Sequence, residues 1–281
     1  MSRWRRFGPK WVAMAFILTG SQAYAITTDG DWSDWFTYHG NLASDDWEQG
    51  NYTLLDGHIR AQADEEGTTP GGGGQEYDNE EIFYVFRYAD NSDPSLGGTI
   101  HVGLVTGFDA AGRFGAGGPH YAGDMFFDFG ATGGFDLAVA VGAEDTPENL
   151  GGLRFSQAWV NLGAPNWTTL GVNTHYDSGP YRVDENAAGA VDYTGAVEVA
   201  WGGAGPHNFL EIALTVGGDV ASLLTDPENG GLGLHWTMLC GNDVVDVMDE
   251  NPLNPVPEPA SIALLGIGFM GLALRSRFPQ C

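Results

Sequence analysis

Basic side chains are nearly absent from the central part of the chain. Residues 26–256 contain no lysine and only five arginines, against 36 acidic residues. A surface of this charge cannot neutralise phosphates, which excludes a nucleic-acid-binding protein and disfavours contact with anionic lipid. It suits a solvated extracellular domain that could attract divalent cations, although a need for solubility alone would also explain it.

Cysteines are scarce as well, and the familiar catalytic motifs are missing. Cys240 and Cys281 are the only cysteines, so no disulfide framework exists. The chain contains no Gly-x-Ser-x-Gly, no His-Glu-x-x-His and no Cys-x-x-Cys, and its seven histidines are dispersed. We therefore predict that the protein is not an enzyme. A facing pair of carboxylates that hydrolyses glycosides remains an alternative, because the sequence cannot choose one pair among so many acids.

Long apolar runs occur at the two ends of the chain. At the N-terminus, a basic stretch that ends at Lys10 is followed by "WVAMAFILTG" and then by the small-x-small pattern Ala23–Ala25. This order is typical of a secretory signal peptide, so we expect residues 1–25 to be removed and the mature chain to begin at Ile26.

At the C-terminus, Ala260–Leu274 contains no charged residue. As a helix it would span about 22 Å, which is short of the roughly 30 Å hydrocarbon core of a bilayer. Arg275 and Arg277 follow directly and are typical of a stop-transfer flank. We predict a marginal transmembrane helix, with a buried core helix as the alternative.

The triplet Pro257, Glu258 and Pro259 stands directly before this apolar run. The order of triplet, apolar helix and basic cluster resembles the PEP-CTERM sorting signal of Gram-negative envelope proteins. The resemblance implies recognition by an exosortase-type membrane protease that cuts near the triplet. The protein would then be released or re-anchored at the cell surface, typically alongside exopolysaccharide production, after transient anchoring in the inner membrane.

Between the two ends, the sequence predicts β-strands almost throughout. Apolar residues alternate with polar ones at a period of two, as half-buried strands require. Glycine-rich and Asx-rich turns, including "GGDVASL", separate the strands. We predict an all-β fold, an antiparallel β-sandwich or jelly roll over residues 26–250, and a spacer and sorting tail over residues 251–281, with "DVMDENPLNPVP" as spacer. The alternating sets are Ile82, Tyr84, Phe86 and Tyr88; Met125, Phe127 and Phe129; Phe135, Leu137, Val139 and Val141; Leu210, Ile212, Leu214 and Val216; and Leu234, Trp236, Met238 and Cys240.

The opening "ITTDGDWSDW", followed later by "GDMFFDFG", resembles family 9 carbohydrate-binding modules and their DOMON-like relatives. That resemblance implies a β-sandwich that binds glycan, sometimes with structural calcium, and Asp29, Asp31 and Asp34 match its opening stretch. The three acids are also close enough in sequence to share one Ca²⁺, with solvated turn chemistry as the alternative.

Sugar rings stack on exposed aromatic side chains, so tryptophans among polar neighbours are candidate platforms. Four tryptophans meet this description: Trp32, Trp35, Trp47 and Trp167. Together these features predict an exported, non-catalytic protein that interacts with extracellular polysaccharide or biofilm matrix. The alternatives are a secreted glycan-active hydrolase and a purely structural surface protein.

Overall fold

The computed structural model describes most of the central part of the chain. The described residues are 25–44, 47–48, 50–63, 78–90, 93–115, 118–142, 158–160, 167–168, 182–183, 191–238 and 243–253. The predicted signal peptide up to residue 24, the Pro-Glu-Pro triplet, the apolar run and the arginines after it lie outside these residues. Within the described ranges, no helix has the length and apolar character needed to cross a bilayer.

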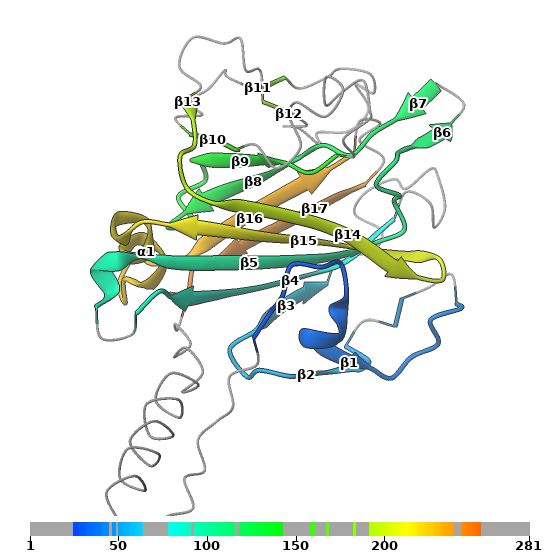
Figure 1. Cartoon of the computed structure of the whole chain (residues 1–281), viewed down its shortest axis with the longest axis horizontal. Helices are drawn as coiled ribbons and strands as arrows, with labels where there is room; N and C mark the ends of the chain where they lie inside the picture. Colours follow the sequence, from blue (N-terminus) through cyan, green and yellow to red (C-terminus); the bar gives the residue numbers. More distant parts are fainter. Residues whose placement is uncertain are drawn as a thin grey trace, which may run out of the picture.

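Two antiparallel sheets form the body of the molecule (Figure 1). The five-stranded sheet has the order β14 (Val197–Ala204), β15 (His207–Val216), β5 (Gly98–Thr106), β4 (Asn79–Tyr88), β3 (Arg60–Ala63). The six-stranded sheet has the order β13 (Val191–Asp192), β10 (Ala158–Val160), β9 (Leu137–Ala140), β8 (Asp124–Phe129), β16 (Leu232–Thr237), β17 (Val244–Asp249). Three hairpins complete the strands: β1 (Phe36–Tyr38) with β2 (Tyr52–Leu54), β6 (Arg113–Gly115) with β7 (Gly118–His120), and β11 (Trp167–Thr168) with β12 (Arg182–Val183).

The main core lies between the two sheets. Ile82, Tyr84 and Phe86 of β4 share one buried cluster with Met125 and Phe127 of β8. Leu210, Ile212 and Leu214 of β15 and Leu234, Trp236 and Met238, in and just after β16, belong to the same cluster. The predicted period of two is confirmed for these strands, and so is the prediction of an all-β, sandwich-like fold.

The outer face of the five-stranded sheet is also buried over part of its area. Phe83 and Val85 of β4 and Phe209 of β15 point away from the main core, yet they are at most 2% exposed. Residues 26–59, which we call the covering segment, pack against them (Figure 1). The segment contains a 3₁₀ turn (Trp32–Asp34) and the hairpin β1–β2.

Three local predictions were wrong. The stretch "GGDVASL" was expected to be a turn but contributes to helix α1 (Gly218–Thr225), because Ala221 and Leu224, three residues apart, share one buried helix face. Phe135 precedes β9 and packs with Phe126 on the outer side of the six-stranded sheet, so it does not share the inward face of Leu137.

The third correction concerns "DVMDENPLNPVP", which was expected to be a spacer. Its first four residues, Asp246–Asp249, belong to β17, which pairs with β16. Leu253 is 3% exposed and is part of the main core. The folded body therefore continues to Leu253.

Candidate functional site

A buried carboxylate fastens the start of the covering segment to the sheet. Glu211 points outward from β15 but is only 1% exposed. It accepts hydrogen bonds from the backbone N–H groups of Asp29, at 3.0 Å, and Gly30, and from the indole Nε1 of Trp35. Burial raises the pKa of Glu211 to about 7, although the three hydrogen bonds act in the opposite direction, and the charge of Asp34 raises it further.

Gly30 explains why the chain can approach the sheet so closely at this point. Its φ angle is +81°, a conformation that residues with a Cβ rarely adopt. A Cβ on Gly30 would lie 2.6 Å from the backbone nitrogen of Gly202 in β14. Glycine is therefore required at position 30, both for the positive φ angle and for the close contact with β14.

A second buried carboxylate fastens the other half of the covering segment. Glu81 of β4 is 2% exposed and accepts hydrogen bonds from Trp47 Nε1, at 3.0 Å, and from the hydroxyl of Tyr52. Burial raises the pKa of Glu81, and these hydrogen bonds partly offset the increase. Glu81 and Glu211 thus serve the same purpose at two places on one sheet face.

The four tryptophans predicted as sugar platforms lie in different surroundings. Trp35 is fully buried and Trp47 is 3% exposed, so the expected exposure of these two rings was wrong. The indole N–H groups of both rings donate to buried carboxylates that are remote in the sequence. Trp32 is half-buried, with its ring centroid 5.8 Å from that of Trp47. Trp167 lies in β11, and its side chain is outside the described part of the structure.

The three aspartates predicted to bind calcium each accept a backbone hydrogen bond. Asp29 accepts from Asp31 N and Asp31 from Ser33 N, both at 2.9 Å, while Asp34 accepts from Thr27 N. Burial raises the pKa of Asp34, and the charges of Asp29 and Asp31 raise it further. Among the described residues, no group of three or more His, Cys, Asp or Glu side chains is arranged to hold a metal ion. Calcium binding by Asp29, Asp31 and Asp34 stays a prediction.

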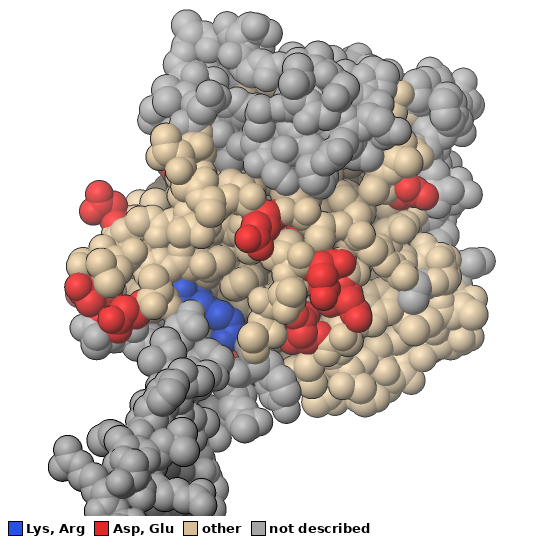
Figure 2. All heavy atoms as spheres, viewed as in Figure 1, with Lys and Arg blue, Asp and Glu red and all other residues tan. Residues whose placement is uncertain are grey.

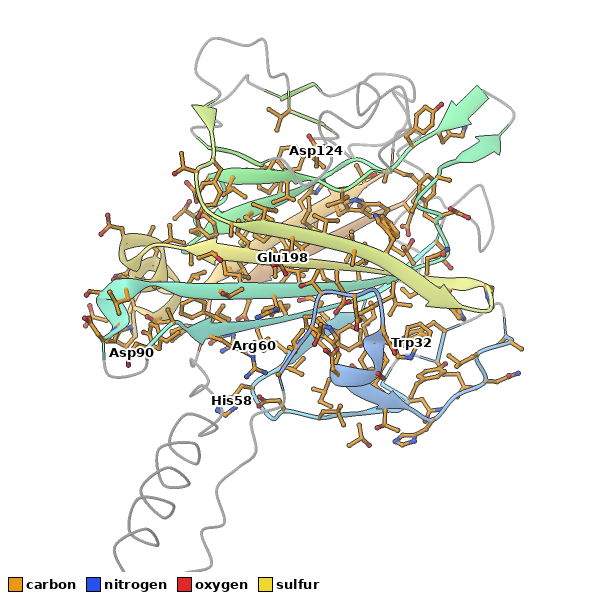
Figure 3. The ribbon with its side chains drawn as sticks, in the orientation of Figure 1. Trp32, His58, Arg60, Asp90, Asp124 and Glu198 are labelled. Atoms are coloured by element: carbon orange, nitrogen blue, oxygen red, sulfur yellow. The ribbon has the colours of Figure 1, made fainter. Side chains whose placement is uncertain are left out.

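The part of the outer sheet face next to the start of the covering segment is hollowed. The hollow has a volume of about 290 Å³ and lies over β5, β14 and β15. Figure 3 shows one of its residues, Glu198, on the face of this sheet. Hydroxyl and other polar side chains contribute much of the lining, which consists of Ile26, Thr27, Thr28, Thr99, His101, Ala196, Glu198, Ala213 and Thr215.

His101 is the titratable base in this hollow. Burial lowers the pKa of His101 to about 4, and the charge of Arg87 lowers it further, so the imidazole is neutral at pH 7. Its Nδ1 atom is buried and has no hydrogen-bond partner among the described residues. This neutral imidazole can both donate and accept hydrogen bonds, and the Glu198 carboxylate, which lies across Ala213 on the next strand but one, can accept them.

A third polar cluster lies at the edge of the same sheet, where the C-terminal part of the body ends. Arg60 of β3 donates to the carboxylate of Asp249, to Asn251 O at 3.2 Å and to Pro252 O at 2.7 Å. The hydroxyl of Tyr84 donates to the same carboxylate at 2.8 Å. Burial alone would raise the pKa of Asp249, but hydrogen bonds, led by the one from Arg60, hold it below its usual value. We call Arg60, Tyr84 and Asp249 the C-terminal clasp.

The clasp borders an open hollow of about 700 Å³ at the edge of the sheet. Figure 3 shows Arg60 in this part of the molecule, apart from Glu198. In the view of Figure 2, acidic residues occur at several separate places, whereas the described basic side chains are visible at a single place. Arg87, the other arginine whose side chain is described, pairs with Asp56 at 3.2 Å and is 5% exposed.

The fold and the C-terminal motif define the class of protein as an exported all-β protein. Its C-terminal residues 255–277 match the family model of the PEP-CTERM protein-sorting motif. The match contains Pro257, Glu258, Pro259, Arg275 and Arg277, so the predicted sorting signal is confirmed. The motif indicates export to the cell envelope and processing by an exosortase, a membrane protease.

No curated protein and no solved structure matches the chain. The resemblance to family 9 carbohydrate-binding modules and DOMON-like domains is therefore not supported by a comparison.

The sequence analysis missed the two buried carboxylates. A signal for them was present, because Glu81 and Glu211 each stand in a strand that carries apolar residues on both faces. Phe83 and Phe209 lie on the same outward faces as these acids. Apolar residues on the second face predict that something covers it, and an acid beside them must then find hydrogen-bond donors in the cover.

Proposed function

We propose that the protein is a non-catalytic envelope component that interacts with extracellular polysaccharide after exosortase sorting. The observation that carries this proposal is the hollow over β5, β14 and β15. Threonine hydroxyls, the neutral imidazole of His101 and the carboxylate of Glu198 can exchange hydrogen bonds with sugar hydroxyls. Trp32 and Trp167 remain the aromatic candidates for stacking on a sugar ring.

The environment of Glu211 supports a binding role over a catalytic one. A carboxyl whose pKa is raised to about 7 is a typical candidate for a general acid. Here, however, both carboxylate oxygens accept hydrogen bonds from the covering segment, and the residue is 1% exposed. A substrate would have to displace that segment, so the raised pKa follows from a structural attachment.

A binding test should measure retention and turnover in the same samples. The mature chain is offered neutral, amino-containing and acidic polysaccharides, and its retardation in polysaccharide-containing gels is compared with the release of reducing ends. We expect retention without product. The double variant Thr99→Val/Glu198→Gln should weaken retention about tenfold, because it removes a hydroxyl and a charged hydrogen-bond acceptor from the hollow.

Glu228→Gln is the matched control, because Glu228 is an exposed acid that does not line the hollow. Its retention should equal that of the unaltered protein. Released sugar would instead indicate a glycan-active hydrolase. Neither retention nor product on any polysaccharide would indicate a structural surface protein.

A further inference from the structure

The described part of the folded body reaches very close to the sorting motif. Leu253 is buried in the main core, and its N–H donates to the carbonyl of Leu224 at 2.8 Å. The family match to the sorting motif begins at residue 255, and the triplet begins at Pro257. Only Asn254, Pro255 and Val256 separate the folded body from the triplet.

Three residues can span at most about 11 Å even when fully extended. A protease must enclose several residues around the bond that it cuts, so its cleft would meet the folded body within this short distance. Cleavage close to a folded domain generally proceeds from a locally opened state, and its rate then follows the population of that state.

The contacts just before Leu253 determine how easily this end of the body opens. Arg60 donates to the Asp249 carboxylate and to the carbonyl oxygens of Asn251 and Pro252, and Tyr84 donates to the same carboxylate. The clasp joins this segment to two other strands, since Arg60 lies in β3 and Tyr84 in β4. Releasing Arg60 would free residues 249–252 from β3. Asp249 would then be held by Tyr84 and by its pairing with Leu232, and Leu253 by its bond to Leu224.

We propose that the C-terminal clasp limits the access of the sorting protease to the Pro-Glu-Pro triplet, and that the tail is removed from a clasp-opened state. The reaction itself is unchanged. A peptide bond near the triplet breaks, its acyl carbon passes to water or to an acceptor amine, and the amine of the tail leaves with a proton. The clasp therefore regulates the exosortase processing that the sorting motif indicates.

The test compares the rate of tail removal among variants of the full chain in the cells that sort it. Arg60→Gln should speed removal about five- to thirtyfold, because it makes the opened state more populated. A flexible Gly-Ser insert of about 12 residues between Leu253 and Asn254 should speed removal similarly, because it separates the triplet from an intact body. Combining both changes should give no more than the insert alone.

Arg87→Gln is the matched control. Arg87 also lies on the five-stranded sheet and also pairs with an aspartate, but it does not contact residues 249–253. This variant should leave the rate of tail removal unchanged. Amide hydrogen exchange at Leu253 of the mature chain, which reports clasp opening without the protease, should accelerate in Arg60→Gln and not in Arg87→Gln.

The proposal rests on exosortase sorting, and the Leu253 exchange measurement separates a failure of the clasp from a failure of sorting. The proposal is overturned if Arg60→Gln and the insert leave the rate of removal unchanged. It is also overturned if their effects multiply, if Arg87→Gln speeds removal as much as Arg60→Gln, or if Leu253 exchange is the same in all variants.

Discussion

At the scale of single residues, the buried carboxylates make the stability of this protein depend on pH in an unusual direction. The folded chain raises the pKa of Glu211 from its ordinary value of 4.5 to about 7. The folded state therefore binds this proton more tightly than the unfolded state does. The resulting contribution to stability is present below about pH 4.5 and is lost as the pH rises to about 7.

We expect Glu211→Gln to remove much of this dependence. Between pH 5 and pH 8, the free energy of unfolding of the unaltered protein should fall by on the order of 2 kcal/mol more than that of the variant. Urea unfolding of the mature chain at both pH values measures the difference. The contribution of His101, which is lost as the pH falls from about 6.5 to about 4, is common to both proteins and cancels.

Glu198→Gln serves as the control, because Glu198 is an exposed acid on the neighbouring strand β14. Its pH dependence should match that of the unaltered protein. An equally steep decline in Glu211→Gln would contradict this account of Glu211.

Sequence reasoning could identify the chemical types of the site residues but not their surroundings. Trp35 and Trp47 stand among polar neighbours, and that pattern favoured exposure. Their partners, Glu211 and Glu81, lie 176 and 34 residues away in the sequence. A hydrogen bond across such distances depends on the three-dimensional fold, so local composition cannot predict it.

At the scale of elements, the covering segment contributes a second core to the five-stranded sheet. Phe36 of β1 is 1% exposed, and its ring stacks on that of Phe83 with centroids 4.6 Å apart. Thr37, the next residue of the same strand, is exposed.

Phe36→Ala should therefore lower the free energy of unfolding by about 3–5 kcal/mol, because it leaves a cavity between the segment and the sheet. Thr37→Ala should change it by less than about 0.5 kcal/mol. Urea unfolding followed by tryptophan fluorescence measures both effects. A loss below about 1 kcal/mol in Phe36→Ala would mean that the segment adds little to the fold.

The long strands could be predicted, and the covering segment could not. Strands β4, β8 and β15 carry a period of two that fixes their inward faces. The hairpin β1–β2 has strands of three residues each, which is too short for a reliable period. Helix α1 was missed for a related reason, since only two of its eight residues, Ala221 and Leu224, are fully buried, with Val220 packed beside them.

At the scale of the whole molecule, the charge imbalance should make stability sensitive to salt. Residues 26–256 carry 36 acidic residues and five arginines, so the folded body repels itself. Raising NaCl from about 20 mM to about 300 mM shortens the Debye length from about 20 Å to about 6 Å. The melting temperature of the mature chain at pH 7.5 should therefore rise by a few degrees.

The same melting measurement in CaCl₂, at an ionic strength equal to that of the NaCl samples, tests the metal site predicted from the sequence. If Asp29, Asp31 and Asp34 bind Ca²⁺, calcium should raise the melting temperature more than sodium does, and Asp34→Asn should remove the difference. Equal shifts of the melting temperature in the two salts would mean that calcium acts only by screening charge. The prediction of a calcium site at these three aspartates would then be wrong.

The fold class could be predicted from the sequence, but the order of the strands in the sheets could not. Composition, turn chemistry and strand period predicted an all-β sandwich, and the order of triplet, apolar run and arginines identified the sorting motif. The sheet order brings β15 beside β5, although about a hundred residues separate them. The C-terminal boundary of the folded body was predicted too early, because the prolines in this stretch suggested a spacer. The contact that holds Leu253, from its N–H to the carbonyl of Leu224 in α1, joins residues that are distant in the sequence.

The covering segment also has a consequence for the order in which the chain can fold. Export delivers the mature chain from its N-terminus, so residues 26–59 reach the outside first. Their partners Phe83 and Val105 follow, but Phe209 and Glu211 come about 150 residues later. The covering segment therefore cannot complete its packing on the sheet until most of the body has been exported. Until then its tryptophans are accessible to water or to a chaperone.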